Sequence, residues 1–244
     1  MGNRPKIGIV GGMGSVAAAY FFQRLVELTP AETDQDYIET LVHNNTAVPD
    51  RTAGILDGKP SPLPELHRSV EILNRFGADY IMLACMTSHY FVEELQKKSQ
   101  AVIIDAIDEA SRRCSEAGFR RVGVIGSTGT MKLGIFKNKL ADYGIEVLQM
   151  NDGDQLKHFT EPIYAEWGIK TGHIVGRPKD LLIQGGNILI EAGAEAIVAG
   201  CSELPLVFDS ETFSVPLIDT IDVLLETAID KCLNRQAADS GSRA

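Results

Sequence analysis

The sequence predicts an α/β fold made of two similar domains, each built on a parallel sheet. Short apolar segments alternate with stretches of helical periodicity along nearly the whole chain, and their length favours buried strands. Alternation of strand and helix is typical of parallel sheets with right-handed crossovers. The predicted strands are Lys6–Val10, Tyr37–His43, Ala78–Ala84, Ala101–Ile104, Arg121–Ile125, Glu146–Gln149, Ala194–Ala199 and Val215–Ile218.

The intervening stretches begin and end as helices do. Ser15–Leu28 opens on a serine suited to the N-cap, and Leu63–Phe76 places its leucine and valine residues on one face before Gly77, a typical C′ residue. A last helix is expected over Thr220–Asn234. Residues 236–244 are expected to form a disordered tail.

The chain also repeats itself. Three segment pairs match in the same order with a shared offset of roughly 115 residues, which indicates duplication of a whole domain. The pairs are KIGIVGGMG from Lys6 and RVGVIGSTG from Arg121, DYIMLAC from Asp79 and EAIVAGC from Glu195, and AVIIDAID from Ala101 and SVPLIDTID from Ser214.

We therefore expect two pseudo-symmetric, Rossmann-like domains, residues 1–105 with 218–235 and residues 106–217. The strand near Ile218 and the last helix are expected to return to the first domain, because Asp105 and Asp219 occupy matching positions. Ends of equivalent strands would converge on an interdomain active-site cleft. Cys85 and Cys201 would face each other across it.

Composition excludes several function classes. Lys and Arg total 23 against 33 Asp and Glu, a net charge of -10, which disfavours nucleic acid as a partner. No apolar run approaches the roughly 20 residues of a membrane span, so no membrane partner is expected. Four cysteines without CxxC spacing are typical of reduced thiols in a cytoplasmic protein.

The two strand-end cysteines allow three explanations. A cysteine in such a place is most often a small buried hydrophobe. Polar residues after both Cys85 and Cys201 indicate instead that each strand leaves the core there, which favours a chemical role. A zinc site with His89 and Glu203 is the third explanation, but neither half has the paired short spacing of such sites, so no metal is expected.

Two glycine-rich turns follow predicted strands. Gly11–Ala17 meets the dinucleotide pattern, but the second strand ends in HNN and lacks the acidic residue that holds a ribose. The turn is therefore interpreted as a loop for another anion, such as a carboxylate. Ser127–Thr130 would do the same from the second half, or would simply cap a helix.

Cationic residues near these turns are few. Arg51 in the loop NNTAVPDRT is a candidate for bidentate recognition of a carboxylate, although an isolated loop arginine is usually solvated. Lys170 would be a surface lysine on sequence alone.

Taken together, these motifs resemble the cofactor-independent aspartate/glutamate racemase superfamily, and most closely its aspartate racemases. The resemblance covers nearly the whole chain, and its motifs occur in the family's order. The matching segments are GIVGGMG from Gly8, NNTAVPDRT from Asn44, ACMTSH from Ala84, GSTGT from Gly126 and GCSELP from Gly200.

The resemblance implies a two-base racemase of aspartate, with glutamate as the alternative, that needs no cofactor and forms a homodimer. Cys85 and Cys201 resemble the catalytic acid/base pair, and Arg51 and Lys170 the residues that recognise the side-chain carboxylate of a small acidic amino acid. Seven further positions are implied to contact substrate: Met13, Asn45, Met86, Thr87, Thr128, Ser202 and Glu203.

Three departures from the family pattern leave alternatives open. Met86 stands where the family usually has asparagine, Ser15 where it has proline, and Ser202 where it has threonine. The superfamily also contains maleate isomerases, hydantoin racemases and malonate decarboxylases with the same two-cysteine layout. A non-catalytic protein that binds an acidic amino acid between its lobes is the alternative from another class.

Overall fold

The structure is a computed structural model that describes residues 4–241, with the side chains of residues 4–234. It contains two four-stranded parallel sheets with matching strand order. The first runs β2 (Thr40–Asn44), β1 (Ile7–Gly11), β3 (Tyr80–Leu83) and β4 (Val102–Ile103), and the second runs β6 (Glu146–Leu148), β5 (Arg121–Gly126), β7 (Ala196–Gly200) and β8 (Leu217–Asp219). The two-domain α/β fold expected from the sequence is confirmed.

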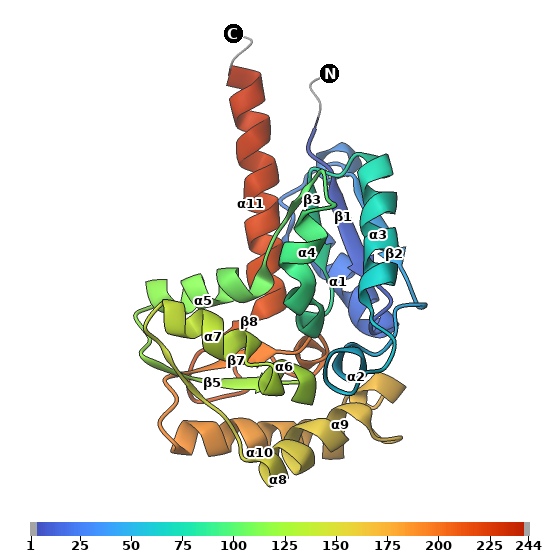
Figure 1. Cartoon of the computed structure of the whole chain (residues 1–244). Helices are drawn as coiled ribbons and strands as arrows, with labels where there is room; N and C mark the ends of the chain where they lie inside the picture. Colours follow the sequence, from blue (N-terminus) through green and yellow to red (C-terminus); the bar gives the residue numbers. More distant parts are fainter. Residues whose placement is uncertain (1–3, 242–244) are drawn as a thin grey trace.

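Helices cover both sheets (Figure 1). In chain order they are α1 (Ser15–Leu28), α2 (Arg51–Leu56), α3 (Leu63–Phe76), α4 (Val92–Gln96), α5 (Ala106–Glu116), α6 (Thr128–Lys132), α7 (Ile135–Asp142), α8 (Asp152–Gln155), α9 (Glu161–Tyr164), α10 (Arg177–Glu191) and α11 (Thr220–Gly241). None of the helices in the described part of the chain is long and apolar enough to cross a membrane.

The central strands β1 and β5 each carry a glycine against a covering helix. A Cβ on Gly8 would lie 2.8 Å from the side chain of Leu73 in α3, and a Cβ on Gly123 would lie 2.8 Å from Leu189 in α10. Both glycines therefore allow a helix to pack closely on the sheet. This shared device agrees with the repeat seen in the sequence.

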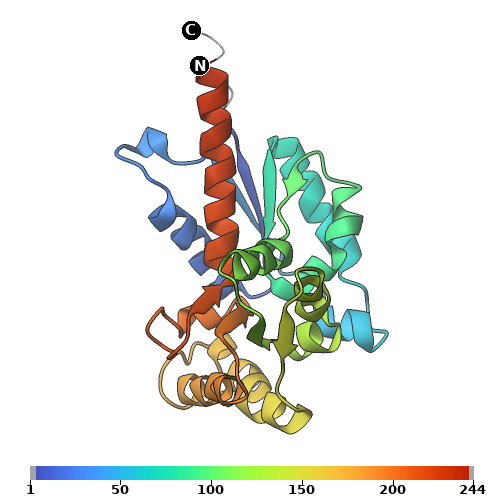
Figure 2. The same ribbon diagram turned by 90° about the vertical axis from the view of Figure 1, so that its left-hand side faces the viewer.

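The last helix of each half packs against the other half. The helix α5, which follows β4, packs against α7 and β8 of the second half, and α11, which follows β8, packs against α1 of the first half and against α5. In Figures 1 and 2, α11 runs upward beside the first sheet, away from the second. One buried apolar cluster consequently contains Ile7 of β1, Val122 of β5 and Leu224 of α11.

Two expectations about the end of the chain need correction. The strand near Ile218 stays in the second sheet, where β8 pairs with β7, so only α11 returns to the first half. The expected tail is also helical in part, because α11 continues to Gly241 through glutamine and alanine, which favour helices. Residues 242–244 lie outside the described residues.

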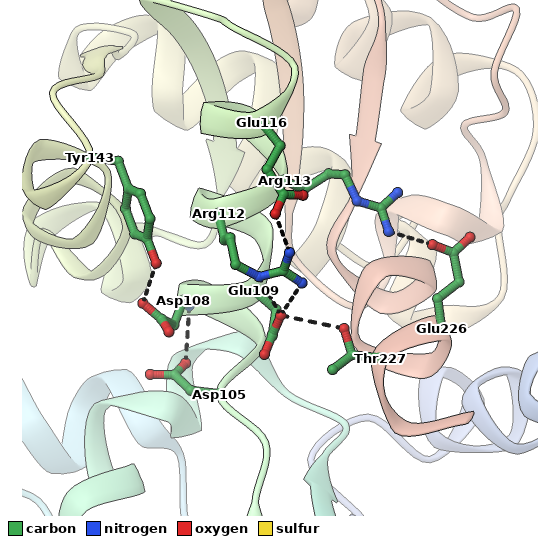
Figure 3. A network of polar contacts seen from close by, with 9 residues as sticks. All are labelled: Asp105, Asp108, Glu109, Arg112, Arg113, Glu116, Tyr143, Glu226 and Thr227. Atoms are coloured by element: carbon green, nitrogen blue, oxygen red, sulfur yellow. Dashed lines mark hydrogen bonds and ion pairs between the residues drawn. The ribbon is translucent and has the colours of Figure 1, made fainter. Parts of the chain in front are cut away.

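Polar contacts join the two exchanged helices (Figure 3). Arg113 of α5 pairs with Glu226 of α11 at 2.6 Å, and the Thr227 hydroxyl donates to Glu109 at 3.4 Å. Both members of the ion pair are more than one third exposed, so the pair itself stabilises little. The network sets the register of two helices that the apolar cluster already holds together.

The exchanged helices begin in the same way. Asp105 caps α5 by accepting from the amides of Ile107 and Asp108, and Asp219 caps α11 by accepting from Ile221 at 2.8 Å and Asp222 at 3.4 Å. Burial, and after it the charge of Asp222, raises the pKa of Asp219 from 3.8 to about 7. The cap is therefore a carboxyl group that holds its proton far above the usual pH.

We expect Asp219→Asn to stabilise the protein at neutral pH. With a raised pKa in the folded state, the stability contribution of Asp219 is full below pH 3.8 and is lost as the pH rises through about 7. Asparagine keeps the accepting oxygen and never ionises, so the variant should gain roughly 2–4 kcal/mol at about pH 8 and almost nothing at about pH 4. Urea unfolding at both pH values measures this gain.

The matched control is Asp105→Asn, which makes the same change in the corresponding cap of α5. An equal dependence of the unfolding free energy on pH in wild type and Asp219→Asn would show that Asp219 does not hold the proton.

Candidate functional site

The carboxyl ends of the two sheets meet at one cavity. Loops after β1 and β3 reach it from the first half, and loops after β5 and β7 reach it from the second. Its lining residues are Met13, Asp50, Arg51, Thr52, Cys85, Met86, Thr87, Ser127, Tyr164, Lys170, Gly200, Cys201, Ser202 and Glu203. This is the convergence of strand ends that the sequence predicts for a cleft between duplicated domains.

Both predicted cysteines line this cavity. Each is a free thiol that is 6% exposed, at the end of β3 for Cys85 and of β7 for Cys201. The Cys85 carbonyl accepts from the Ser88 hydroxyl at 2.6 Å and lies 3.1 Å from Nδ1 of His89, so these two side chains hold the corner after β3. Ser88 and His89 thus fix the backbone at Cys85 through its carbonyl oxygen.

The glycine turn after β1 carries Met13 into the cavity. Gly12 and Gly14 have φ angles of 85° and 135°, which side chains rarely adopt. A Cβ on Gly12 would lie 2.2 Å from the Asn45 backbone, and one on Gly14 would lie 2.7 Å from the Glu203 carboxylate. Glycine at these two positions allows the loop after β1 to lie against the Asn45 backbone and the Glu203 carboxylate. It also leaves the N-terminus of α1 uncovered by a side chain.

Arg51, the first residue of α2, points its guanidinium at the cavity. It donates to the carbonyls of Met13 and Pro49, both at 3.2 Å, and its buried Nε has no hydrogen-bond partner in the described structure. Burial alone would lower the pKa of Arg51, but the neighbouring Cys85 and, after it, Asp50 raise that pKa above its ordinary value. Arg51 is thus a permanent cation beside the Cys85 sulfur.

Glu203 is a buried carboxylate that joins three partners across the cavity. One oxygen pairs with the Lys170 ammonium, and the other accepts from Cys201 Sγ at 3.0 Å and from the Ser202 hydroxyl at 3.2 Å. Burial and then the Glu203 charge raise the pKa of Cys201 well above its usual value. Burial alone would lower the pKa of Lys170, but the charge of Glu203, the two cysteines and the hydrogen bond to Glu203 together raise it.

Three hydroxyls close the seam between the halves beside Cys85. Thr87 Oγ1 lies 2.9 Å from both Ser127 Oγ and Thr130 Oγ1, which are 3.0 Å from each other. All three side chains are buried. They place hydrogen-bond donors at the cavity wall without adding a charge.

Two predicted positions, Asn45 and Thr128, are not among the lining residues of the cavity. Asn45 bonds the Glu65 carbonyl and side chain and the Ser69 hydroxyl, at 3.0–3.1 Å. Thr128 bonds Thr160 at 2.9 Å instead of lining the cavity. Met13, Arg51, Met86, Thr87, Lys170, Ser202 and Glu203 do line it, as the resemblance implies.

Five lining residues are not among the predicted site residues: Asp50, Thr52, Ser127, Tyr164 and Gly200. Four of them sit in motifs already singled out, directly beside Arg51, Thr128 or Cys201. Tyr164 lies at the end of α9 in a segment without a clear hydrophobic period. Lys170 Nζ lies 5.5 Å from its ring centroid, which brings α9 and Lys170 to the same wall.

A wider outer cavity adjoins the first one. It is lined by residues 12–17 and by Ile169 and Leu206, and it shares Arg51, Tyr164 and Lys170 with the inner cavity. A small molecule entering from this side passes two cations before it reaches the thiols.

Helix α2 is held in place by a close contact with α6. A Cβ on Gly129 of α6 would lie 2.1 Å from Thr52 Oγ1, so only glycine allows Thr52 to approach. Because Thr52 follows Arg51 directly, this contact between the halves also places the guanidinium.

Comparisons with known proteins point to one family. A family model described as Asp/Glu/hydantoin racemase matches residues 10–228. The broad-specificity amino-acid racemase RacX of Bacillus subtilis is 22% identical over 240 residues, which is 95% of this chain and 100% of that protein. A glutamate racemase of Corynebacterium kroppenstedtii is 34% identical over 135 residues, 53% of this chain and 43% of that one.

Solved structures of racemases resemble this chain as well. The aspartate racemase of Picrophilus torridus superposes with a TM-score of 0.77 at 26% identity, over 93% of this chain and 94% of that one. The glutamate racemase of Francisella tularensis in complex with D-glutamate has a TM-score of 0.68 at 17% identity, over 96% and 82% of the two chains, and this likeness shows the fold alone.

We expect Gly129→Ala to destabilise the protein by about 1–3 kcal/mol, because the added methyl group overlaps Thr52. Adding Thr52→Ala removes the overlapping hydroxyl, so the double variant should recover part of the loss in a double-mutant cycle measured by urea unfolding. Gly153→Ala, where the new methyl meets only Asn151 Oδ1 at 3.3 Å, is the control and should lose little. Additive losses in the cycle would exclude the contact as the cause.

Proposed function

We propose that this chain, which belongs to the Asp/Glu/hydantoin racemase family and is therefore an isomerase, inverts the α-carbon of an acidic amino acid, aspartate before glutamate. The observation that carries the proposal is the pair of free thiols, equally buried at equivalent strand ends in the two halves, on the wall of one cavity.

Racemisation needs a base on one face of the α-carbon and an acid on the other. One cysteine thiolate takes the α-proton, and the C–H electron pair stays on the substrate as a carbanion delocalised into the α-carboxylate. The second cysteine, as thiol, gives its proton to the opposite face and becomes the thiolate. Cys85 and Cys201 suit these roles because they come from opposite halves of the molecule. The exchange is complete without a cofactor.

The carbanion must be stabilised, because an α-proton is far less acidic than a thiol, whose pKa is ordinarily about 8.5. The hydroxyls of Thr87, Ser127 and Ser202 line the cavity and can donate to the α-carboxylate as its charge grows. The buried position of both thiols keeps water from competing.

Two cations support an acidic side chain in the substrate. Arg51 and Lys170 line both the inner and the outer cavity. In the ligand-free structure the Arg51 guanidinium bonds backbone carbonyls, and a substrate carboxylate is a stronger partner for it. A charge-assisted bond of this kind is worth about 1.5–3 kcal/mol. The aspartate racemase of P. torridus and the breadth of RacX make aspartate the first substrate to test, within a panel of amino acids.

We expect the protein to exchange the α-proton of both L- and D-aspartate in deuterium oxide, seen as loss of the α-proton resonance. Cys85→Ser and Cys201→Ser should each lower the rate of racemisation by roughly 10²–10⁴-fold, since each removes one proton-transfer group. Cys114→Ser is the control, because Cys114 lies in α5 outside the cavity. A wild-type protein that exchanges no α-proton from aspartate, glutamate or the rest of the panel would overturn the proposal.

Met86 stands where the racemase family usually has asparagine, and this difference affects the expected turnover. The structure buries its side chain to 1% exposure in the apolar cluster shared by both halves, although the residue also contributes to the cavity wall. An asparagine amide there would be largely enclosed by apolar side chains. Met86 therefore contributes apolar packing at a position where an amide would instead offer hydrogen bonds.

We accordingly expect Met86→Asn to lower the free energy of unfolding by about 1–3 kcal/mol and to leave kcat for aspartate no higher than in the wild type. Met86→Leu keeps an apolar side chain of similar volume and should cost less than about 1.5 kcal/mol. Urea unfolding and steady-state kinetics of both variants check this. A rise in kcat for Met86→Asn would show that the amide reaches the substrate.

A further inference from the structure

The two thiols line the same cavity and are equally exposed, but they have different neighbours. Cys85 faces the guanidinium of Arg51, and Cys201 faces the carboxylate of Glu203. Both residues are 6% exposed, so exposure to solvent does not distinguish them. The charge of the neighbouring side chain does.

The contact with Glu203 determines where the proton of Cys201 lies. An ionised carboxylate only accepts hydrogen bonds, so Cys201 Sγ, 3.0 Å from Glu203 Oε2, must donate and must carry its hydrogen. The Lys170 ammonium pairs with the other oxygen of Glu203. The Ser202 hydroxyl, 3.2 Å away, is a second donor to the same oxygen.

Cys85 has a cation as its charged neighbour instead of a carboxylate. Arg51 and Cys85 line the same cavity, and a guanidinium has five donor hydrogens and accepts none, so Arg51 can donate to the Cys85 sulfur but cannot accept a hydrogen bond from it. A neighbouring cation favours the thiolate. The same cavity thus holds one thiol that donates to a carboxylate and one that has a guanidinium as its neighbour.

We propose that Glu203 is a positioning residue that keeps Cys201 protonated in the ligand-free enzyme, so that Cys85 is the resting base. The catalytic consequence rests on the function proposed above: the resting form accepts the enantiomer whose α-hydrogen faces Cys85. The other enantiomer must bind the minor form, in which the proton has moved to Cys85.

This asymmetry has a defined kinetic signature. The equilibrium between enantiomers is even, so kcat/KM must be the same in both directions. Binding to a minor form raises the apparent dissociation constant in inverse proportion to its population. The enantiomer that reacts at Cys201 therefore has the higher KM and, to compensate, the higher kcat.

The first test needs no substrate. Ligand-free protein is treated with iodoacetamide, which reacts with thiolates, and the two cysteine peptides are followed by mass spectrometry. We expect Cys85 to be alkylated at least about tenfold faster than Cys201, which corresponds to about one pKa unit between them. In Glu203→Gln the amide carries no charge and can donate to sulfur, so alkylation of Cys201 should rise about tenfold or more while Cys85 keeps its rate.

Glu203→Asp is the matched control, because it keeps the charge beside Cys201 and should leave that thiol slow. A merely structural role of Glu203 would change both alkylation rates together. Equal rates for Cys85 and Cys201 in the wild type, or an unchanged ratio in a folded Glu203→Gln variant, would overturn the inference. The wild-type ratio decides even where the variant does not fold.

The second test uses the racemase reaction. Glu203→Gln should bring the KM values of the two enantiomers together, whereas a loss of packing would lower kcat in both directions and leave the KM ratio unchanged. Unequal alkylation that Glu203→Gln abolishes, in a protein that exchanges no α-proton, would support the assignment of the thiols and refute the proposed reaction.

Discussion

The exchange of the last helices between the two halves holds the molecule in its working shape. Because α5 packs on the second half and α11 on the first, residues of β1, β5 and α11 belong to one apolar cluster. Burial of apolar surface is the main stabilising contribution in folding. The carboxyl ends of the two sheets therefore cannot separate without exposing part of that cluster to water. The cavity between the thiols is a consequence of this shared core.

The two halves of the site share a common plan but differ in the charged side chains beside the thiols. Both halves place a glycine against a covering helix, an aspartate on the exchanged helix and a cysteine at the same strand end. The residues next to the cysteines have diverged, and a cation lies beside one sulfur and a carboxylate beside the other. In a two-base racemisation one thiol must be protonated while the other is not, and a difference in neighbouring charge decides which form prevails before substrate binds.

Strands and thiols could be predicted because they depend on local pattern. Apolar segments flanked by glycine indicate strands, and parallel strands bring Cys85 and Cys201 to one edge. The direction of a side chain within a loop depends on partners distant in sequence. Asn45 is drawn away by Glu65 and Ser69, and Lys170 finds Glu203 33 residues further on. No spacing in the sequence encodes these pairs, so neither the hydrogen bonds of Asn45 nor the ion pair between Lys170 and Glu203 can be predicted from it.

The hydroxyls of Thr87, Ser127 and Thr130 form a ring of hydrogen bonds, and a bound acceptor can take over one of them. Each hydroxyl has one hydrogen, and in a closed ring all three hydrogens are spent on one another. An arriving acceptor gains a donor by breaking one side of the ring. Two of the three sides join Thr87 to the second half, so opening either of them replaces a bond between the halves with a bond to the bound molecule. An anion is the acceptor that gains most from this exchange, because hydrogen bonds to a charged acceptor are the stronger ones.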